Sequence, residues 1–348
     1  MVGPEEPVEP RKLLQSLRYS GRLRRDANTD ANTFVGFSGT SVDISHGRMN
    51  ILTATERGRR LSKAGDHHYV PQFHLGKWSD QQGKISQWGR IPFNNKLVCT
   101  PVTTAATAYV PGLYSLAHVN DEEAQQIEIK LFGKIETAAK PVLDKLISHG
   151  PAKLSVEERY WWTIYLNASL LRVPHIVEMV TSSVQERISQ DLSQPIPEFD
   201  AAKGDRPEST LYEWASKHAP ARVANSGLKV LVDLIQSEKA IDRIIHLRWL
   251  VKDVSTGPRR LLLGDNPFER VGDLYKSRTA ISIPLSPTHL FIASDAPDIL
   301  DHFARMPARD VVKANNQSSL INAKRFVYGE AERDFIERYL PMLFPKLS

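Results

Sequence analysis

The sequence predicts an α+β protein, with a predominantly helical body and a C-terminal mixed β-sheet. Apolar residues recur at helical spacing through the middle of the chain. Short apolar runs separated by Gly, Pro and Asn follow from residue 248, and such runs are typical of strands joined by turns. A chain of 348 residues, of which 41% are hydrophobic, can bury a substantial core. We expect one globular domain over residues 65–348, helical over 65–240 and sheet-containing over 241–348, behind a basic, disordered tail at 1–64.

The formal net charge of +5 lies mostly in this tail, because residues 1–64 contain eleven Lys or Arg and seven Asp or Glu. The tail could bind nucleic acid through its phosphates, although basic segments without apolar periodicity are often simply disordered. A start of translation at Met49 would leave residues 1–48 outside the native protein. Cys99 is the single cysteine, which excludes an internal disulfide and a Cys-rich metal site. The sequence contains no run of about 18 apolar residues and no secretory signal, so we expect a cytoplasmic protein that binds no membrane.

In chain order, the first predicted elements after the tail are a short helix at Pro71 and two strands. Residues 121–148 should then form one long amphipathic helix. A capping box at Ser155 and Glu158 begins the next helix, which is apolar almost all round and therefore central. Pro174 must kink or restart that helix, because its ring clashes with the preceding turn. The strands are expected at 83–90, 96–104, 248–254, 259–263, 279–285, 289–293 and 324–328, and the later helices at 211–217, 224–237, 308–322 and 332–339, with a polar connection at 191–207.

The most distinctive stretch is Asp66-His67-His68-Tyr69-Val70-Pro71-Gln72-Phe73. Pro71 suits the first position of a helix, where its missing N–H costs nothing. The partial positive charge of a helix N-terminus disfavours imidazolium, so His67 and His68 could both stay neutral and bind a metal or accept a proton. Adjacent side chains on extended backbone point to opposite faces, so one imidazole should reach a site while the other is packed. Two polar rings that merely anchor a loop remain the alternative.

This stretch resembles the opening signature of the bacterial "domain of unknown function 4238" family. Similar segments follow around Glu128 and Glu136, at Arg172-Val173-Pro174, at Gly264-Asp265-Asn266-Pro267 and from Asn315 to Gly329, so the resemblance covers most of the chain. It implies no activity, because none is established for the family as a whole. The pattern His-His-x-x-Pro also resembles, weakly, the first half of HNH nucleases, which need an Asn and a further His close downstream on a compact hairpin and helix. Here the following stretch offers Asn94, Asn95 and a distant His118.

Glu128, Glu136 and Arg172 are the candidate charged residues of the helical body. Glu128 and Glu136 are eight residues apart, about 80° around a regular helix, and both border its apolar stripe. They could point into a polar site, or they could form a solvated flank with neighbouring lysines. Arg172 ends the central helix, where a guanidinium needs a carboxylate or a bound anion as its partner. A structural Arg–Glu pair is the alternative to an anion site.

Asp265 and Asn266 end a strand of leucines, where polar side chains are well placed to meet a ligand. Asp265 could ligate a divalent metal, and Asn266 could orient a substrate. An Asx-turn before Pro267 is the alternative. Asn315 lies in a predicted helix, where Asn is a poor helix former, and this hints at a polar contact. Gln72 and Asn315, together with Glu128, are candidates for a supporting second layer.

These residues combine into one hypothesis, a metal-dependent hydrolase acting on a phosphodiester or nucleotide. His68, Glu136 and Asp265 would bind a divalent metal such as Mn, Mg or Zn, with Arg172 holding an anionic or nucleotide ligand. His67 or His68 would accept the proton, and Asn266 would assist catalysis. The competing hypothesis is a non-enzymatic binding or scaffold module, in which the same residues form a buried structural network. An enzyme needs a cleft that reaches these groups, whereas a structural network does not.

Overall fold

The computed structural model describes residues 33–35, 41–43 and 65–342. The expectation of a disordered tail therefore falls mainly on residues outside this range; within it, β1 (Thr33–Val35) and β2 (Ser41–Asp43) pair antiparallel. The chain divides into two compact units. The larger unit comprises Ser62–Leu116, Asn120–Thr181 and Leu228–Ser348, and the smaller unit includes Ala117–Val119 and Ser182–Gly227.

The larger unit contains two four-stranded sheets and one two-stranded sheet, which together with its helices confirm the α+β class. The strand orders are β7-β11-β10-β9, β5-β4-β12-β8 and β3-β6. All of these pairings are antiparallel, whereas the sequence led us to expect one mixed C-terminal sheet. The strands are β3 (Asp66–His68), β4 (Lys84–Arg90), β5 (Leu97–Thr103), β6 (Tyr109–Pro111), β7 (Arg248–Asp253), β8 (Leu263–Gly264), β9 (Glu269–Val271), β10 (Ala280–Ser286), β11 (His289–Ser294) and β12 (Phe326–Tyr328).

Short connections explain the antiparallel order. Pro287 and Thr288 alone separate β10 from β11, and a tight turn can join only antiparallel strands. The second sheet brings β4 and β5, from the first third of the chain, against β12 and β8. Four of the C-terminal strands, β7, β9, β10 and β11, therefore form a sheet of their own, whereas β8 and β12 join a sheet with β4 and β5.

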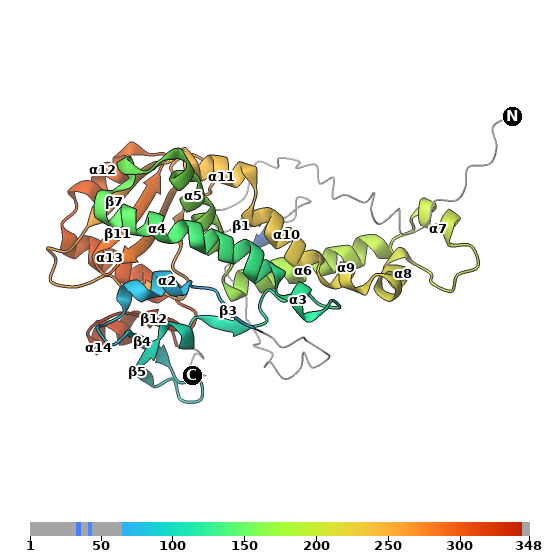
Figure 1. The fold of residues 1–348 in the computed structure, drawn as a ribbon, viewed down its shortest axis with the longest axis horizontal. Helices are drawn as coiled ribbons and strands as arrows, with labels where there is room; N and C mark the ends of the chain where they lie inside the picture. The colour runs from blue at the N-terminus through green and yellow to red at the C-terminus, as the bar shows by residue number, and fades with distance from the viewer. Residues whose placement is uncertain (1–32, 36–40, 44–64, 343–348) are drawn as a thin grey trace. The chain divides into compact units, whose positions relative to one another are not determined.

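The helical body is built around α5 (Val156–Leu171), which begins at the predicted capping box of Ser155 and Glu158. Nine of its side chains are buried, as its nearly uniform apolar character predicts. The helix α4 (Gly133–His149) runs beside α5, and α2 (Gln72–Leu75) lies against α4 (Figure 1). The chain leaves α5 at Arg172 and restarts as α6 at Pro174, as expected.

The predicted single helix at 121–148 is divided. It consists of α3 (Asp121–Ala124), a π-helix η3 (Ile127–Phe132) and then α4. In η3 the N–H of Gly133 bonds to the carbonyl of Glu128, five residues earlier. Such wide turns are rare and often occur at functional sites.

A buried apolar cluster surrounds the connection between β3 and α2. It combines Tyr69, Val70 and Leu75 with residues of β4, β8 and β12, such as Ile85 and Tyr328. The strand β3 is thereby anchored between the helical body and the second sheet. This anchoring determines where the imidazoles of His67 and His68 lie.

The remaining helices complete the two units, and four of them, α7, α9, α11 and α12, were not resolved as separate elements by the sequence patterns. Phe199, Leu211 and Trp214 form the buried cluster of the smaller unit. Among the helices of the described residues, none is both long and apolar enough to cross a lipid bilayer. The bounds are α6 (Pro174–Ser193), α7 (Pro197–Lys203), α8 (Leu211–His218), α9 (Pro220–Ala224), α10 (Ser226–Ile235), α11 (Glu238–Ile245), α12 (Pro297–Arg305), α13 (Ala308–Asn322) and α14 (Arg333–Tyr339).

Candidate functional site

His67 is the packed member of the histidine pair in β3, with only 1% of its surface exposed. The backbone N–H of Tyr114 donates to His67 Nδ1 at 2.9 Å, so the ring hydrogen lies on Nε2, which donates to Gln125 Oε1 at 2.6 Å. The ring also stacks on Tyr114 with the centroids 5.4 Å apart. Burial lowers the pKa of His67, which keeps the imidazole neutral. Both ring nitrogens are thus already used by protein partners.

His68 is half-buried and lies on the other face of β3, as strand alternation predicts. Burial lowers its pKa, and the nearby carboxylate of Glu136 offsets this only in part. The backbone of Ala105 also favours the charged form of the ring, and Nε2 is buried without a partner. A neutral imidazole carries its hydrogen on one ring nitrogen, so Nε2 presents a lone pair in the tautomer with the hydrogen on Nδ1.

Arg172 is completely buried at the end of α5. Its Nη1 donates to Glu136 Oε1 at 2.8 Å, and its Nη2 donates to the backbone carbonyl of His68. Its guanidinium also lies over the ring of Phe132, 4.3 Å from the centroid. Burial opposes the charge, but Glu136 and Tyr114 outweigh it and raise the pKa of Arg172. Arg172 is therefore a permanent cation that ties α5 to α4 and β3.

Glu128 approaches the same guanidinium from η3. Its Oε2 is buried without a hydrogen-bond partner. Burial raises the pKa of Glu128 to about 7, with Arg172 opposing the shift and Glu136 adding to it. Near neutral pH this carboxyl group can therefore either give or take a proton.

The π-helix brings the two glutamates together. In a regular α-helix, residues eight apart would be separated by about 80°. A π-helical turn takes up one extra residue, so the remaining seven steps amount to about two turns and the side chains differ by only about 20°. Both carboxylates act electrostatically on Arg172. The sequence pattern contained both residues but not the wide turn that aligns them.

We call His68, Glu128, Glu136 and Arg172 the junction cluster. Three of its polar atoms, His68 Nε2, Glu128 Oε2 and Arg172 Nε, are buried without a hydrogen-bond partner. Buried polar groups are paired in nearly all native structures, so each exception calls for an explanation. The side chain of Glu136 is 27% exposed and, with His68, connects the cluster to solvent.

A known protein family covers the whole of this cluster. The family, described as a protein of unknown function, DUF4238, matches residues 66–333, from the first residue of β3 to the first residue of α14. The chain belongs to the DUF4238 family. No curated protein and no solved structure matches it. The predicted family resemblance is thus confirmed, and the match includes every member of the junction cluster.

Asp265 of this DUF4238 protein has a different set of contacts. It is 3% exposed, and its carboxylate accepts hydrogen bonds from the backbone N–H groups of Lys324, Arg325 and Phe326, at 2.7, 2.7 and 3.0 Å. These bonds hold the connection between α13 and β12. Asn266 follows Asp265 and is half-buried. The acid and amide are thus built into the second sheet rather than into the junction cluster.

The predicted supporting residues also take structural positions. Asn315 Nδ2 lies 3.5 Å from the carbonyl of Leu262, and Asn316 accepts from the N–H of Leu262 at 2.9 Å. Gln72 is exposed and accepts from Thr104 at 3.3 Å. Within residues 33–35, 41–43 and 65–342, no three His, Cys, Asp or Glu side chains are arranged to hold a metal ion. The set His68, Glu136 and Asp265 is therefore not assembled as a metal site.

Sequence reasoning missed His74, which is fully buried beside Tyr165 of α5. Its Nε2 donates to the carbonyl of Pro284 at 2.6 Å, and its Nδ1 accepts from the hydroxyl of Tyr165 at 2.7 Å. Burial lowers its pKa to about 4. Its position between Phe73 and Leu75 on a short apolar helix was the only local signal. Gln125 and Tyr114, which position His67, had none.

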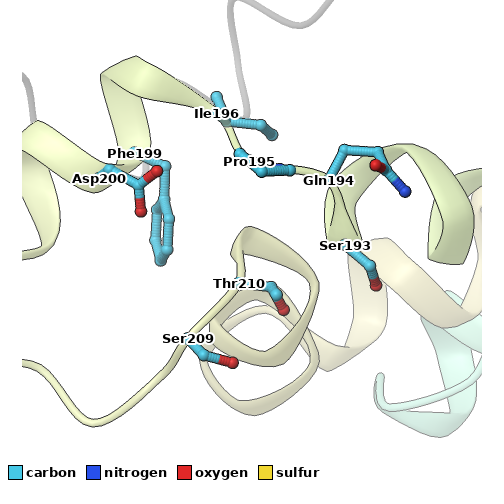
Figure 2. Close-up of a pocket in the computed structure, with 8 residues that line it drawn as sticks. All are labelled: Ser193, Gln194, Pro195, Ile196, Phe199, Asp200, Ser209 and Thr210. Carbon is cyan, nitrogen blue, oxygen red and sulfur yellow. The ribbon is translucent and has the colours of Figure 1, made fainter.

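Two cavities of the DUF4238 protein lie elsewhere. One, in the smaller unit, has a volume of about 240 Å³ and lies between the α6–α7 connection and the start of α8 (Figure 2). Phe199, Asp200, Ser209 and Thr210 are among its lining residues. The other, also about 240 Å³, lies in the larger unit and is lined by residues that include Arg259, Lys313 and Phe335. Neither is lined by a residue of the junction cluster.

Proposed function

We propose that the chain is a hydrolase whose acid–base centre is the junction cluster. The observation that carries the proposal is the presence of three unpartnered, buried polar atoms in one cluster, next to the partly exposed Glu136. Unpaired buried polar atoms cost stability, and functional sites are where such costs are concentrated. The raised pKa of Glu128 and the lowered pKa of His68 lend further support.

Each member has a distinct role in the proposal. The lone pair on His68 Nε2 accepts a proton from the attacking water, and the carboxyl group of Glu128 donates one to the leaving group. The N–H at Arg172 Nε stabilises negative charge that develops on the substrate. Glu136 is a positioning residue, because it holds Arg172 through the 2.8 Å ion pair.

The proposed hydrolase differs from the one expected from the sequence in two respects. Its proton transfers are not assigned to a metal site, and Arg172 is not assigned to hold a phosphate. Proton transfer is assigned to His68 and Glu128 and does not involve Asp265, whose oxygens accept three backbone hydrogen bonds. Both terminal nitrogens of Arg172 are likewise occupied by protein acceptors. Any contribution of a divalent cation is a quantity to measure in the same experiment.

The test is hydrolysis of chromogenic nitrophenyl esters, nitroanilides and nitrophenyl phosphodiesters by the full chain, with and without added Mn²⁺, Mg²⁺ or Zn²⁺. We expect His68→Gln and Glu128→Gln each to lower turnover by about 100-fold or more. The exposed residues His149 and Glu122 provide matched controls, and His149→Gln and Glu122→Gln should retain full turnover. Equal turnover in all four variants would contradict the proposal.

A scaffold module is the second candidate function, and a different observation favours it. Both ring nitrogens of His67 and both oxygens of Asp265 are bound by protein partners. A fully satisfied polar network fixes how elements meet without any chemistry. For this candidate, His68→Gln and Glu128→Gln would change the free energy of unfolding while no substrate class is hydrolysed.

A further inference from the structure

We infer that the junction cluster acts on a neutral carboxamide, so that the chain is an amidase rather than a phosphodiesterase. This inference rests on the proposed function and names its substrate class. It is drawn from the donor and acceptor roles of the unpartnered atoms and from the charge around them.

The unpartnered atoms include one obligatory donor and one acceptor. Arg172 Nε can only donate, because a guanidinium has no acceptor atom. His68 Nε2 belongs to a ring that burial keeps neutral, and it accepts in the tautomer with the hydrogen on Nδ1. Glu128 Oε2 donates when its carboxyl group is protonated. A carboxamide offers a matching pair of groups, a carbonyl oxygen that accepts and an N–H that donates.

The charge of the cluster argues against a phosphodiester. Arg172 is the one cation of the cluster, and its Nη1 is paired with Glu136 at 2.8 Å. Glu128 adds a second carboxyl group beside the same guanidinium. A phosphate would therefore bring a further negative charge to a site with no spare positive charge, where like charges repel strongly at low dielectric constant. A neutral carbonyl avoids this repulsion and becomes negative only in the transition state, next to the Arg172 N–H.

The reaction balances with these groups alone. His68 Nε2 takes a proton from water as the water oxygen bonds to the carbonyl carbon, which forms a tetrahedral oxyanion. Glu128 then protonates the amide nitrogen, the C–N bond breaks, and a carboxylic acid and an amine are released. The proton on His68 returns to Glu128 through solvent, and both groups regain their starting states.

Access is through Glu136 and His68. The side chain of Glu136 is 27% exposed and His68 is half-buried, whereas Arg172 beneath them is fully buried. All three unpartnered atoms are buried, so the inference requires the side chains of Glu136 and His68, which meet solvent, to move aside before a substrate can reach them.

The first experiment compares three substrate classes on the full chain, using an acyl nitroanilide, a nitrophenyl ester and bis(nitrophenyl) phosphate. We expect the anilide to be hydrolysed, with turnover reduced by about 100-fold or more in His68→Gln and Glu128→Gln. Hydrolysis of the phosphodiester alone, with the same dependence on His68 and Glu128, would overturn the amide inference and leave the proposed hydrolase intact. Hydrolysis of none of the three would overturn both.

The second experiment tests the charge argument without depending on the choice of anilide. Glu136→Gln frees the positive charge of Arg172, so inorganic phosphate should bind this variant at least about ten times more tightly than the parent, as measured by calorimetry. Glu136→Asp keeps the charge and should resemble the parent. Equal phosphate affinity in the parent and in Glu136→Gln would contradict the inference.

Discussion

His67 and His68 are neighbours in β3, yet their imidazoles have different surroundings. The alternation of a strand places them on opposite faces, and this much follows from the sequence. Their partners do not follow from it, because Gln125 lies 58 residues from His67 along the chain and Arg172 lies 104 residues from His68. Both ring nitrogens of His67 are hydrogen-bonded, whereas Nε2 of His68 is buried without a partner.

Glu128 should make the stability of the protein depend on pH in a definite direction. Its pKa is about 7 in the folded chain against an ordinary value of 4.5, so the folded state favours the protonated form. The stability that Glu128 contributes to the folded state is therefore present below pH 4.5 and is lost as pH rises through 7. Glu128→Gln cannot ionise at this position and should not lose this stability. The free energy of unfolding of the variant, relative to that of the parent, should therefore be higher at pH 8 than at pH 5 by about 2 kcal/mol, after allowance for partial exposure.

Urea unfolding at the two pH values measures this difference. Glu122→Gln, at an exposed position of α3, should show the pH dependence of the parent. A Glu128→Gln variant whose relative stability is the same at pH 5 and pH 8 would show that the carboxyl group has an ordinary pKa.

His74 should make the stability of the protein depend on pH in the opposite direction. Its pKa is about 4 in the folded protein against an ordinary value of 6.5, because it is buried as the neutral form between Tyr165 and Pro284. The stability that it contributes is present above pH 6.5 and is lost as pH falls through 4, amounting to about 3 kcal/mol.

Replacement of His74 by Gln removes the group that titrates. In thermal or urea unfolding, His74→Gln should be less stable than the parent at pH 7 and should lose less stability between pH 6.5 and 4. His149→Gln, at an exposed position at the end of α4, is the control and should behave as the parent. A parent and a His74→Gln variant with parallel stability curves would count against a buried neutral imidazole.

At the level of elements, local patterns predicted most helices and strands but not the interruption at η3. The apolar stripe of residues 121–148 fits one continuous helix, because the hydrophobic period does not reveal a single wide turn. The same limit applies to β8 (Leu263–Gly264), predicted as a longer strand at 259–263. Arg260 and Leu262 there bond to Asn316 of α13 instead of to a neighbouring strand.

Asp265 should stabilise the junction between α13 and β12. Asp265→Asn replaces one acceptor oxygen by an NH₂ group that faces backbone donors, so we expect a loss of about 3 kcal/mol in the free energy of unfolding. The control, Asp301→Asn at an exposed position of α12, should change it by less than about 0.5 kcal/mol. Metal analysis of the same proteins separates the two interpretations of Asp265. Unchanged stability together with lost metal would favour the role of a metal ligand.

At the scale of the molecule, the buried clusters around Tyr69, Trp88, Val254 and Phe199 begin at Tyr69 among the residues that the structure describes. The family match also begins at Asp66. We propose that residues 65–348 fold as an independent domain. A chain that starts at Gly65 should therefore unfold cooperatively, within about 2 °C of the full-length protein, in calorimetry. A fall of more than about 5 °C would show that the first 64 residues stabilise the fold.

The sequence by itself determined the α+β class, the positions of most elements and the resemblance to the DUF4238 family. These depend on periodicity, capping and turn residues, which act over a few neighbours along the chain. Only the tertiary structure decided that Arg172 pairs with Glu136, that Asp265 binds the backbone ahead of β12, and that a π-helical turn directs Glu128 to the same guanidinium. These contacts depend on which surfaces meet when distant segments pack, and no local pattern of residues encodes that.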